Sequence, residues 1–262
     1  MRALAFFAAC STVCACGLTI VGTAGPAGGG TDSPEAGDAS GGPDAPRPPD
    51  DAPHVDLDGG PSPCGADFLA LCDTFEREAV TTAFDWSLPG SGLPVIIDDA
   101  TSVSPTRSLA VRLTGFSGPS GFVSRPLSPP SARKIRVAFA MLVDSAMAYS
   151  QVLSVQFPGG PKYLQVIASY GALEIAEQDF SAFPTYFDAT DAGAAGEGWA
   201  RYELRVDLDA AELVLLRGAE TLATRALERN YGALGDLRVG ITYTALGAPA
   251  TIRYDDVGIL AE

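Results

Sequence analysis

The stretch ARYELRVDL, residues 200–208, decides the class of fold because apolar and polar side chains alternate along it without interruption. In an extended chain one face would carry only the apolar members, which are Ala200, Tyr202, Leu204, Val206 and Leu208. A period of two predicts a β-strand with one buried face and one solvated face. A turn at residues 209–210 and a second apolar run at residues 212–217 predict that this strand opens a hairpin.

Runs of the same kind, separated by Gly, Pro, Asp and Ser, continue from Cys72 to the C-terminus. We expect further strands at residues 108–113, 134–141, 151–157, 163–168, 172–178, 220–226, 237–243 and 251–260. No stretch shows a sustained helical period with caps. The sequence therefore predicts an all-β fold, an antiparallel two-sheet β-sandwich of the jelly-roll type, as one domain over residues 64–262.

Three short signatures resemble a known group of domains. The first is the Trp-led strand that begins at Trp199, with the hairpin that follows it at residues 214–218. The others are an opening Asp-Thr-Phe-Glu at residues 73–76, followed ten residues later by Trp86, and a closing Tyr-Asp-Asp-Val-Gly-Ile at residues 254–259. Together they are similar to laminin-G-like, concanavalin A-like lectin/glucanase jelly rolls. The resemblance implies a fold rather than an activity, because lectins, adhesion modules and hydrolases share it.

The resemblance also implies a structural calcium ion. Jelly-roll carbohydrate-binding modules that open with Phe-Glu and close with Asp-Asp-Val often hold calcium between those strands, and residues 75–76 and 255–257 match these two places. Glu76 and Asp256 are the expected ligands, since calcium prefers carboxylate and carbonyl oxygens. The alternatives for Asp256 are a β-bulge or an ion pair. The partner in such a pair would be Arg253 or Arg77.

Charge and histidine content exclude several functions. The chain carries a net charge of −15, and from Cys64 onward 24 acidic residues outnumber 15 basic ones, a net charge of −9. Such a domain is unsuited to nucleic acid, and its acidity serves solubility or, alternatively, cation binding. The single histidine, His54, precedes the domain. Catalytic triads and His-based zinc sites are therefore excluded from it, which leaves glycosidase-like or lyase-like chemistry.

The sequence offers only weak evidence for a pair of catalytic carboxylates. The Glu-x-Asp-x-x-Glu string that hydrolases of this fold share is missing, and the nearest pair is Glu174 and Glu177. A spacing of three sends two strand side chains to opposite faces, so these residues are expected to be solvated edge charges. No catalytic residue is assigned.

Aromatic residues offer a second kind of candidate site. Trp86 and Trp199 would serve either as platforms for sugar rings or, the favoured interpretation, as residues that close the ends of the core. The stretch from Asp179 to Gly198 is expected to be a long irregular segment. Its aromatic half would cover the sandwich or line a binding cleft, and covering is favoured.

The N-terminus predicts export. One positive charge and a short apolar run form a secretory signal over residues 1–15, too short to span a bilayer. Residues 13–17, VCACG, resemble the lipobox of bacterial lipoproteins, so Cys16 is the expected lipidation site and the protein is expected to be membrane-anchored in the periplasm or on the cell surface. Ordinary cleavage after Ala24 is the alternative. Residues 16–63, rich in Pro, Gly and Asp, predict a disordered tether.

Cleavage before Cys16 would leave Cys64 and Cys72 as a pair, which predicts a disulfide in an oxidising compartment. These features favour a non-catalytic, surface-tethered module that binds carbohydrate or another cell-envelope component. The alternatives are a divergent glycoside hydrolase or polysaccharide lyase, and a structural envelope lipoprotein with no small ligand.

Overall fold

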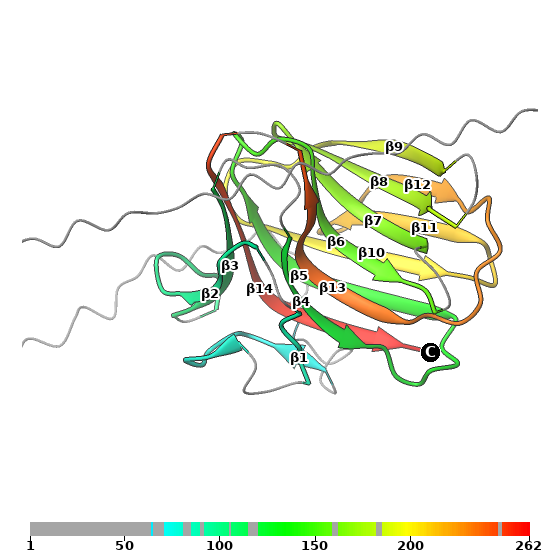
Figure 1. The fold of residues 1–262 in the computed structure, drawn as a ribbon, viewed down its shortest axis with the longest axis horizontal. Coiled ribbons are helices and arrows are strands. Elements are labelled where there is room, and N and C mark those ends of the chain that lie inside the picture. Colours follow the sequence, from blue (N-terminus) through cyan, green and yellow to red (C-terminus); the bar gives the residue numbers. More distant parts are fainter. Residues whose placement is uncertain are drawn as a thin grey trace, which may run out of the picture. The chain divides into compact units, whose positions relative to one another are not determined.

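A computed structural model of the chain describes residues 64, 71–80, 85–89, 92–104, 106–114, 120–158, 162–181, 185–245 and 248–262. Across these ranges the chain forms fourteen β-strands and no α-helix, and accordingly no helix that could cross a membrane. The strands make two antiparallel sheets that lie face to face (Figure 1). The predicted all-β sandwich is confirmed.

The first sheet has eight strands, in the order β12-β11-β10-β5-β14-β3-β2, and β1 pairs with β14 beyond the end of β3. Its members are β1 (Cys72–Asp73), β2 (Val95–Asp98), β3 (Ser108–Leu113), β5 (Lys134–Val143), β10 (Ala200–Asp207), β11 (Glu212–Arg217), β12 (Glu220–Ala226) and β14 (Ala250–Ala261). The alternating stretch at residues 200–208 supplies β10, and the predicted hairpin joins it to β11.

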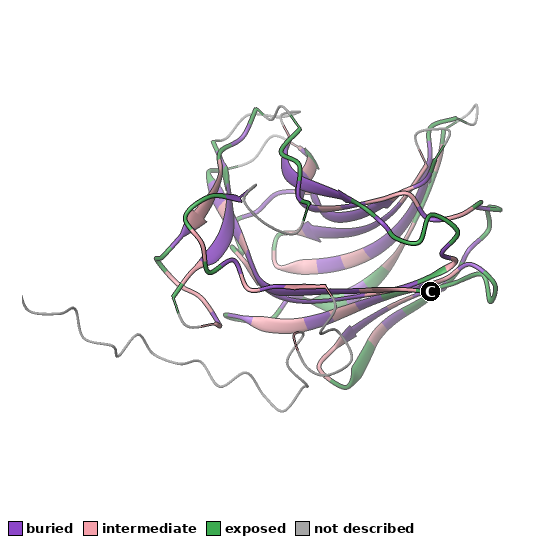
Figure 2. Ribbon diagram, turned by 90° about the horizontal axis from the view of Figure 1, so that it is seen from below, coloured by how far each residue is buried: buried purple, intermediate pink, exposed green. Residues whose placement is uncertain are grey.

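The second sheet has six strands, in the order β4-β13-β6-β7-β8-β9. Its members are β4 (Gly121–Pro126), β6 (Ser150–Gln156), β7 (Lys162–Ser169), β8 (Ala172–Asp179), β9 (Tyr186–Ala194) and β13 (Asp236–Thr244). Buried residues alternate with less buried ones along many of the strands, as Figure 2 shows. Along each strand one set of side chains faces the first sheet and the other set faces outward. The outward set of the central strands is itself partly buried, as Ser154 and Gln165 show.

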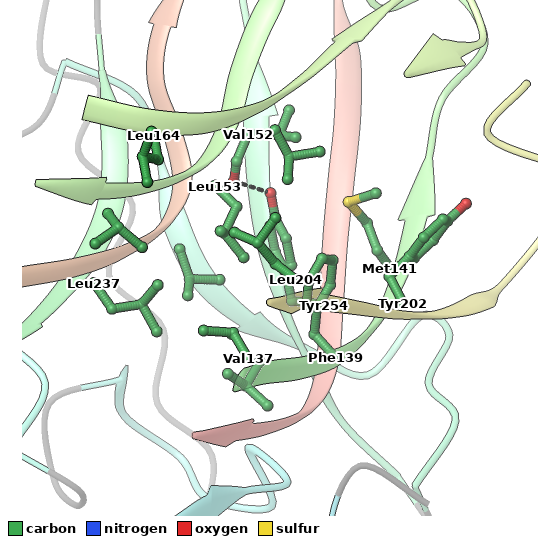
Figure 3. Packing of buried hydrophobic residues seen from close by; sticks show 14 of the residues in the cluster. Val137, Phe139, Met141, Val152, Leu153, Leu164, Tyr202, Leu204, Leu237 and Tyr254 are labelled. Atoms are coloured by element: carbon green, nitrogen blue, oxygen red, sulfur yellow. Dashed lines mark hydrogen bonds between the residues drawn. The ribbon is translucent and has the colours of Figure 1, made fainter. Parts of the chain in front are cut away.

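The core lies between the sheets. Phe139, Tyr202 and Tyr254 of the first sheet meet Leu153 and Leu164 of the second (Figure 3). The rings of Phe139 and Tyr202 stack with their centroids 5.7 Å apart, and the Tyr254 hydroxyl donates a hydrogen bond across the core to a backbone carbonyl of β6. Each fully buried large apolar side chain contributes about 1.5–3 kcal/mol. This packing fixes the backbone of both sheets, and with it the positions of the side chains on their outer faces.

The expectation of an irregular segment from Asp179 to Gly198 is wrong for nearly half of its length, because residues 186–194 form β9 and pair with β8. The segment YFDATDAGA lacks Val, Ile and Leu, so its own β-propensity is low. It is an edge strand, and its one neighbour, β8, supplies the ladder that its composition does not announce.

Candidate functional site

The outer face of the six-stranded sheet carries a groove of about 590 Å³, called here the aromatic groove. The strands β6, β7, β8, β9 and β13 contribute to it, together with the residues just before β6 and just after β8. Its lining consists of Tyr149, Gln151, Tyr163, Gln178, Phe180, Phe187, Arg238, Thr242 and Tyr243. Five of these nine side chains are aromatic and none is a carboxylate.

The aromatic rings of the groove are unusually open to solvent. Phe180, Phe187 and Tyr243 are 50%, 44% and 45% exposed, and they are three of the five large apolar side chains that are exposed in the described parts of the chain. The rings also contact one another edge to face: Tyr149 lies 6.3 Å from Tyr243, and Tyr163 lies 6.2 Å from Phe180, between centroids. Exposed rings gathered in one hollow are typical of a binding surface.

Amide groups form the polar part of the groove. The side-chain oxygen Oε1 of Gln178 accepts hydrogen bonds from Nε2 of Gln151, at 3.2 Å, and from Nε2 of Gln165, at 3.1 Å. The hydroxyl of Thr242 donates to Oε1 of Gln151 at 3.3 Å. Two hydrogen bonds to the side-chain oxygen of Gln178 fix the orientation of its amide.

Arg238 is the only charged residue in the lining. Its guanidinium carbon lies 5.0 Å from the ring centroid of Phe122 and 5.7 Å from that of Tyr163, and Nη2 donates to the side-chain oxygen of Gln156. The two rings hold the guanidinium by cation–π contacts.

The two tryptophans are not part of this site. Trp86 is 4% exposed and its ring nitrogen donates to Asp73 at 2.8 Å, while Trp199 is 8% exposed and donates to Thr101 at 3.0 Å. The favoured interpretation, that both close the core, is confirmed for Trp86. Trp199 packs instead in a small separate cluster with Val103 and Ala140.

The structure contradicts the expectation that Glu177 is a solvated edge charge, because its side chain is fully buried. Its carboxylate accepts hydrogen bonds from the backbone N–H groups of Glu228 and Arg229, at 3.0 and 2.8 Å, and from the Tyr231 hydroxyl at 2.7 Å. Arg225 lies 3.7 Å away. A buried carboxylate persists only with such donors, so the role of Glu177 is structural.

The role predicted for the aromatic residues of the segment 179–198 is also wrong. The aromatic half was expected to cover the sandwich, yet Phe180 and Phe187 line the groove. On β9 the side chain of Phe187 follows the outward alternation, opposite Gln178 of β8. These residues, together with the outward Gln and Tyr side chains of β6 and β7, make the site that the sequence did not single out.

A second group of polar side chains lies where the loop after β1, the loop before β3 and strand β14 meet; we call it the terminal carboxylate cluster, and it comprises Glu76, Ser104, Asp255 and Asp256. The hydroxyl oxygen of Ser104 lies 2.7 Å from Oδ1 of Asp255, 3.3 Å from Oε1 of Glu76 and 3.2 Å from the carbonyl oxygen of Thr74. A hydroxyl donates only one hydrogen, so Ser104 can satisfy only one of these three oxygens. The carboxylates also accept backbone N–H groups, Oδ1 of Asp255 from Asp256 and Oε1 of Glu76 from Thr106 and Arg107.

Burial makes the charges of Asp255 and Asp256 costly. It raises the pKa of Asp255 to about 6 despite hydrogen bonds from Ser104, and it raises the pKa of Asp256 above its usual value despite the nearby charge of Arg201. Asp256 adopts a φ of 49° within a bulge between Asp255 and Gly258. The bulge expected as one alternative for Asp256 is therefore present.

The expected ion pairs for Asp256 are wrong. Arg253 pairs with Asp98 at 3.1 Å and Arg77 pairs with Asp73 at 2.5 Å. No three His, Cys, Asp or Glu side chains are grouped as metal ligands in the described ranges. A hard cation would therefore have to use the hydroxyl of Ser104 and the carbonyl of Thr74 beside the carboxylates, an all-oxygen set of the kind that suits calcium.

The predicted disulfide is confirmed. Cys64 and Cys72 are bonded, with their Cα atoms 5.3 Å apart, inside the usual range for disulfides. Cys72 belongs to β1 and pairs with Gly258 of β14. The predicted signal, the lipidation site Cys16 and the tether all lie outside the described residues.

Comparison with known proteins supports the fold. No protein-family model matches the sequence, and no curated protein matches it. Among solved structures, that of cellulose-induced protein Cip1 has a TM-score of 0.53 at 15% identity and covers 72% of this chain and 96% of that chain. A sialidase has a TM-score of 0.50 at 11% identity over 72% of this chain but 18% of that chain, so this chain spans a small part of that protein. These likenesses show that the chain shares a jelly-roll fold with them.

Proposed function

We propose that the domain binds a carbohydrate chain in the aromatic groove without altering it chemically. The observation that carries the proposal is the groove itself, in which exposed rings flank oriented amides. Sugar rings present C–H faces that pack on aromatic rings and hydroxyl groups that pair with amides. The names of the two structural neighbours, a cellulose-induced protein and a sialidase, agree with a glycan-related role.

The lining supports binding rather than catalysis. Glycosidases need two carboxyl groups about 5–10 Å apart, and the groove lining has none. A lyase would need a side chain that abstracts a proton. Tyr149 lines the groove and could abstract a proton only as a phenolate. Burial raises the pKa of its phenol, so at neutral pH it remains protonated.

A glycan array probed with the purified chain, with and without calcium, tests the proposal. We expect one class of glycan to be retained by the wild-type chain and lost on Phe187→Ala. Tyr170→Ala is the matched control, because Tyr170 is 71% exposed and does not line the groove. Retention of the same glycans by the Phe187 variant would refute the groove as the binding site.

We also propose that the terminal carboxylate cluster binds a structural calcium ion. What supports it is the convergence of three oxygens on the hydroxyl of Ser104 and the raised pKa of Asp255. Binding to the folded state alone would stabilise it by about 2.7 kcal/mol at a calcium concentration one hundred times the Kd. The melting temperature should therefore rise by several degrees with calcium.

Asp256→Ala should abolish that rise. Asp99→Ala, which removes an exposed carboxylate outside the cluster, should keep it. Differential scanning calorimetry in calcium and in excess chelator makes the measurement. Identical melting curves of the wild-type protein under both conditions would show that calcium does not stabilise the fold.

We further propose that Cys16 carries a lipid that anchors the protein to a membrane of the cell envelope. The support is the lipobox-like sequence of residues 13–17 together with the Cys64–Cys72 disulfide, a bond typical of exported proteins. Metabolic labelling with a fatty-acid analogue should mark the wild-type chain and not Cys16→Ser. Equal labelling of both would refute the assignment.

A further inference from the structure

Arg238 lacks a counter-charge in the described structure. No carboxylate of the described residues lies within 4.0 Å of its guanidinium, and its hydrogen-bond partner, Gln156, is uncharged. Arg225, on the first sheet, is paired in contrast with Asp188 at 2.5 Å and has Glu177 at 3.7 Å. Arg225 is buried and Arg238 is partly buried. Among the described residues, Arg225 has carboxylate partners and Arg238 has none.

The same region contains further unmet polar groups. Arg238, Ser154 and Gln165 stand opposite one another in one row across β13, β6 and β7. Nε of Arg238, Oγ of Ser154 and Oε1 of Gln165 are buried and have no hydrogen-bond partner among the described residues. The side chains of Ser154 and Gln165 are 0% and 1% exposed. Buried polar atoms without partners cost free energy, and of the three residues in this row Arg238 alone also lines the groove.

From this arrangement we infer that the groove selects glycans that carry a carboxylate, with the sugar carboxylate paired with Arg238. The inference rests on the proposed function and names the substrate class for the same site. The planar guanidinium donates two parallel hydrogen bonds to a carboxylate, and the flanking rings of Phe122 and Tyr163 restrict its orientation.

The charge balance favours carboxylated sugars over densely charged glycans. The groove offers one positive charge, while the domain as a whole is negative at −9. Distant charges are screened beyond about 8 Å at physiological salt, so a single sugar carboxylate near Arg238 is attracted. A heavily sulfated chain would place many more negative charges against an acidic surface.

The test compares two ligands with the same backbone and linkage: an oligouronate, and its derivative in which each carboxyl group is reduced to a primary alcohol. Isothermal titration calorimetry with the full chain at physiological salt should give at least tenfold tighter binding of the acid. A sialylated oligosaccharide and its reduced counterpart form a second pair, which distinguishes uronic acids from sialic acids as the source of the carboxylate.

Arg238→Gln should abolish the preference while keeping the binding of the reduced ligand, and Arg238→Lys should restore part of it. Arg205→Gln, which changes an exposed arginine on the other sheet, should leave the preference unchanged. Equal binding of acid and reduced ligands would overturn the inference and leave the proposed function standing. Binding of neither member of either pair would also overturn the inference, while the glycan array decides the proposed function separately.

Discussion

The outer faces of the two sheets differ in whether their charged side chains form ion pairs. On the eight-stranded sheet the charged side chains pair with one another: Arg136 and Arg205 both contact Glu203, at 2.6 and 2.8 Å, and Lys134 contacts Asp207 at 2.9 Å. A hollow of about 250 Å³ lies among these pairs. The groove on the six-stranded sheet is instead lined by rings, amides, one threonine and Arg238. A face whose charges pair with one another offers little to a charged ligand, whereas an arginine without a paired carboxylate is suited to binding one.

The largest expected effect comes from removing the exposed rings that distinguish the groove. The double variant Phe187→Ala/Tyr243→Ala should weaken glycan binding about 100-fold, since each ring contributes roughly tenfold. Thermal stability should change little, because both rings are almost half exposed. Titration calorimetry measures the affinity, with Tyr170→Ala as control. An affinity within a factor of three of wild type would mean that the ligand lies elsewhere.

A smaller effect should follow from giving the groove a charge like those of the opposite face. Gln178→Glu keeps the shape of the side chain and the acceptor used by Gln151 and Gln165, but it adds a negative charge near the bound glycan. Binding of an oligouronate should fall about tenfold while binding of its reduced form changes less. The same binding assay decides, and an equal loss for both ligands would show that the amide, not the charge, matters.

The smallest effect should come from the opposite face. Burial raises the pKa of Glu203, but hydrogen bonds from Arg205 and Arg136 outweigh it and lower that pKa overall. A lowered pKa in the folded state stabilises the fold above the unfolded value of about 4.5, and this stabilisation is lost as the pH falls through the folded value.

Glu203→Gln should therefore reduce the free energy of unfolding by about 1 kcal/mol at pH 7. The difference from wild type should shrink below pH 4, and glycan binding should not change. Urea denaturation at several pH values measures both curves. A deficit that stays constant down to pH 3 would contradict the electrostatic explanation.

The contrast between the two faces also explains what the sequence could and could not predict. The apolar alternation of residues 200–208 predicted β10 because its buried face is almost entirely apolar. Strand β9 was missed because its inward positions include Thr190 and Ala192, which carry little apolar signal. Strand β2 was missed as well, since it has only four residues. Strand β4 is as long as β3, but its sequence GFVSRP shows no alternation of apolar and polar residues.

The groove could have been suspected from the polar positions of the strands. The outward side chains of β10 are charged, whereas those of β6 and β7 include Gln151, Tyr163 and Gln165. Amides and tyrosine in place of Lys and Glu are a sign of a surface that is only partly solvated. The sequence alone could not show that Arg238 joins them, because β13 lies far along the chain and reaches β6 only through the fold.

The attachment of the chain at Cys64 has a mechanical consequence. A force applied to the chain before Cys64 passes through the disulfide to Cys72, and then through the pairing of β1 to β14. Strand β14 is joined on its other side to β5, in the middle of the eight-stranded sheet. Tension on the N-terminal segment would thus enter the domain through the eight-stranded sheet, whereas the aromatic groove lies on the six-stranded one.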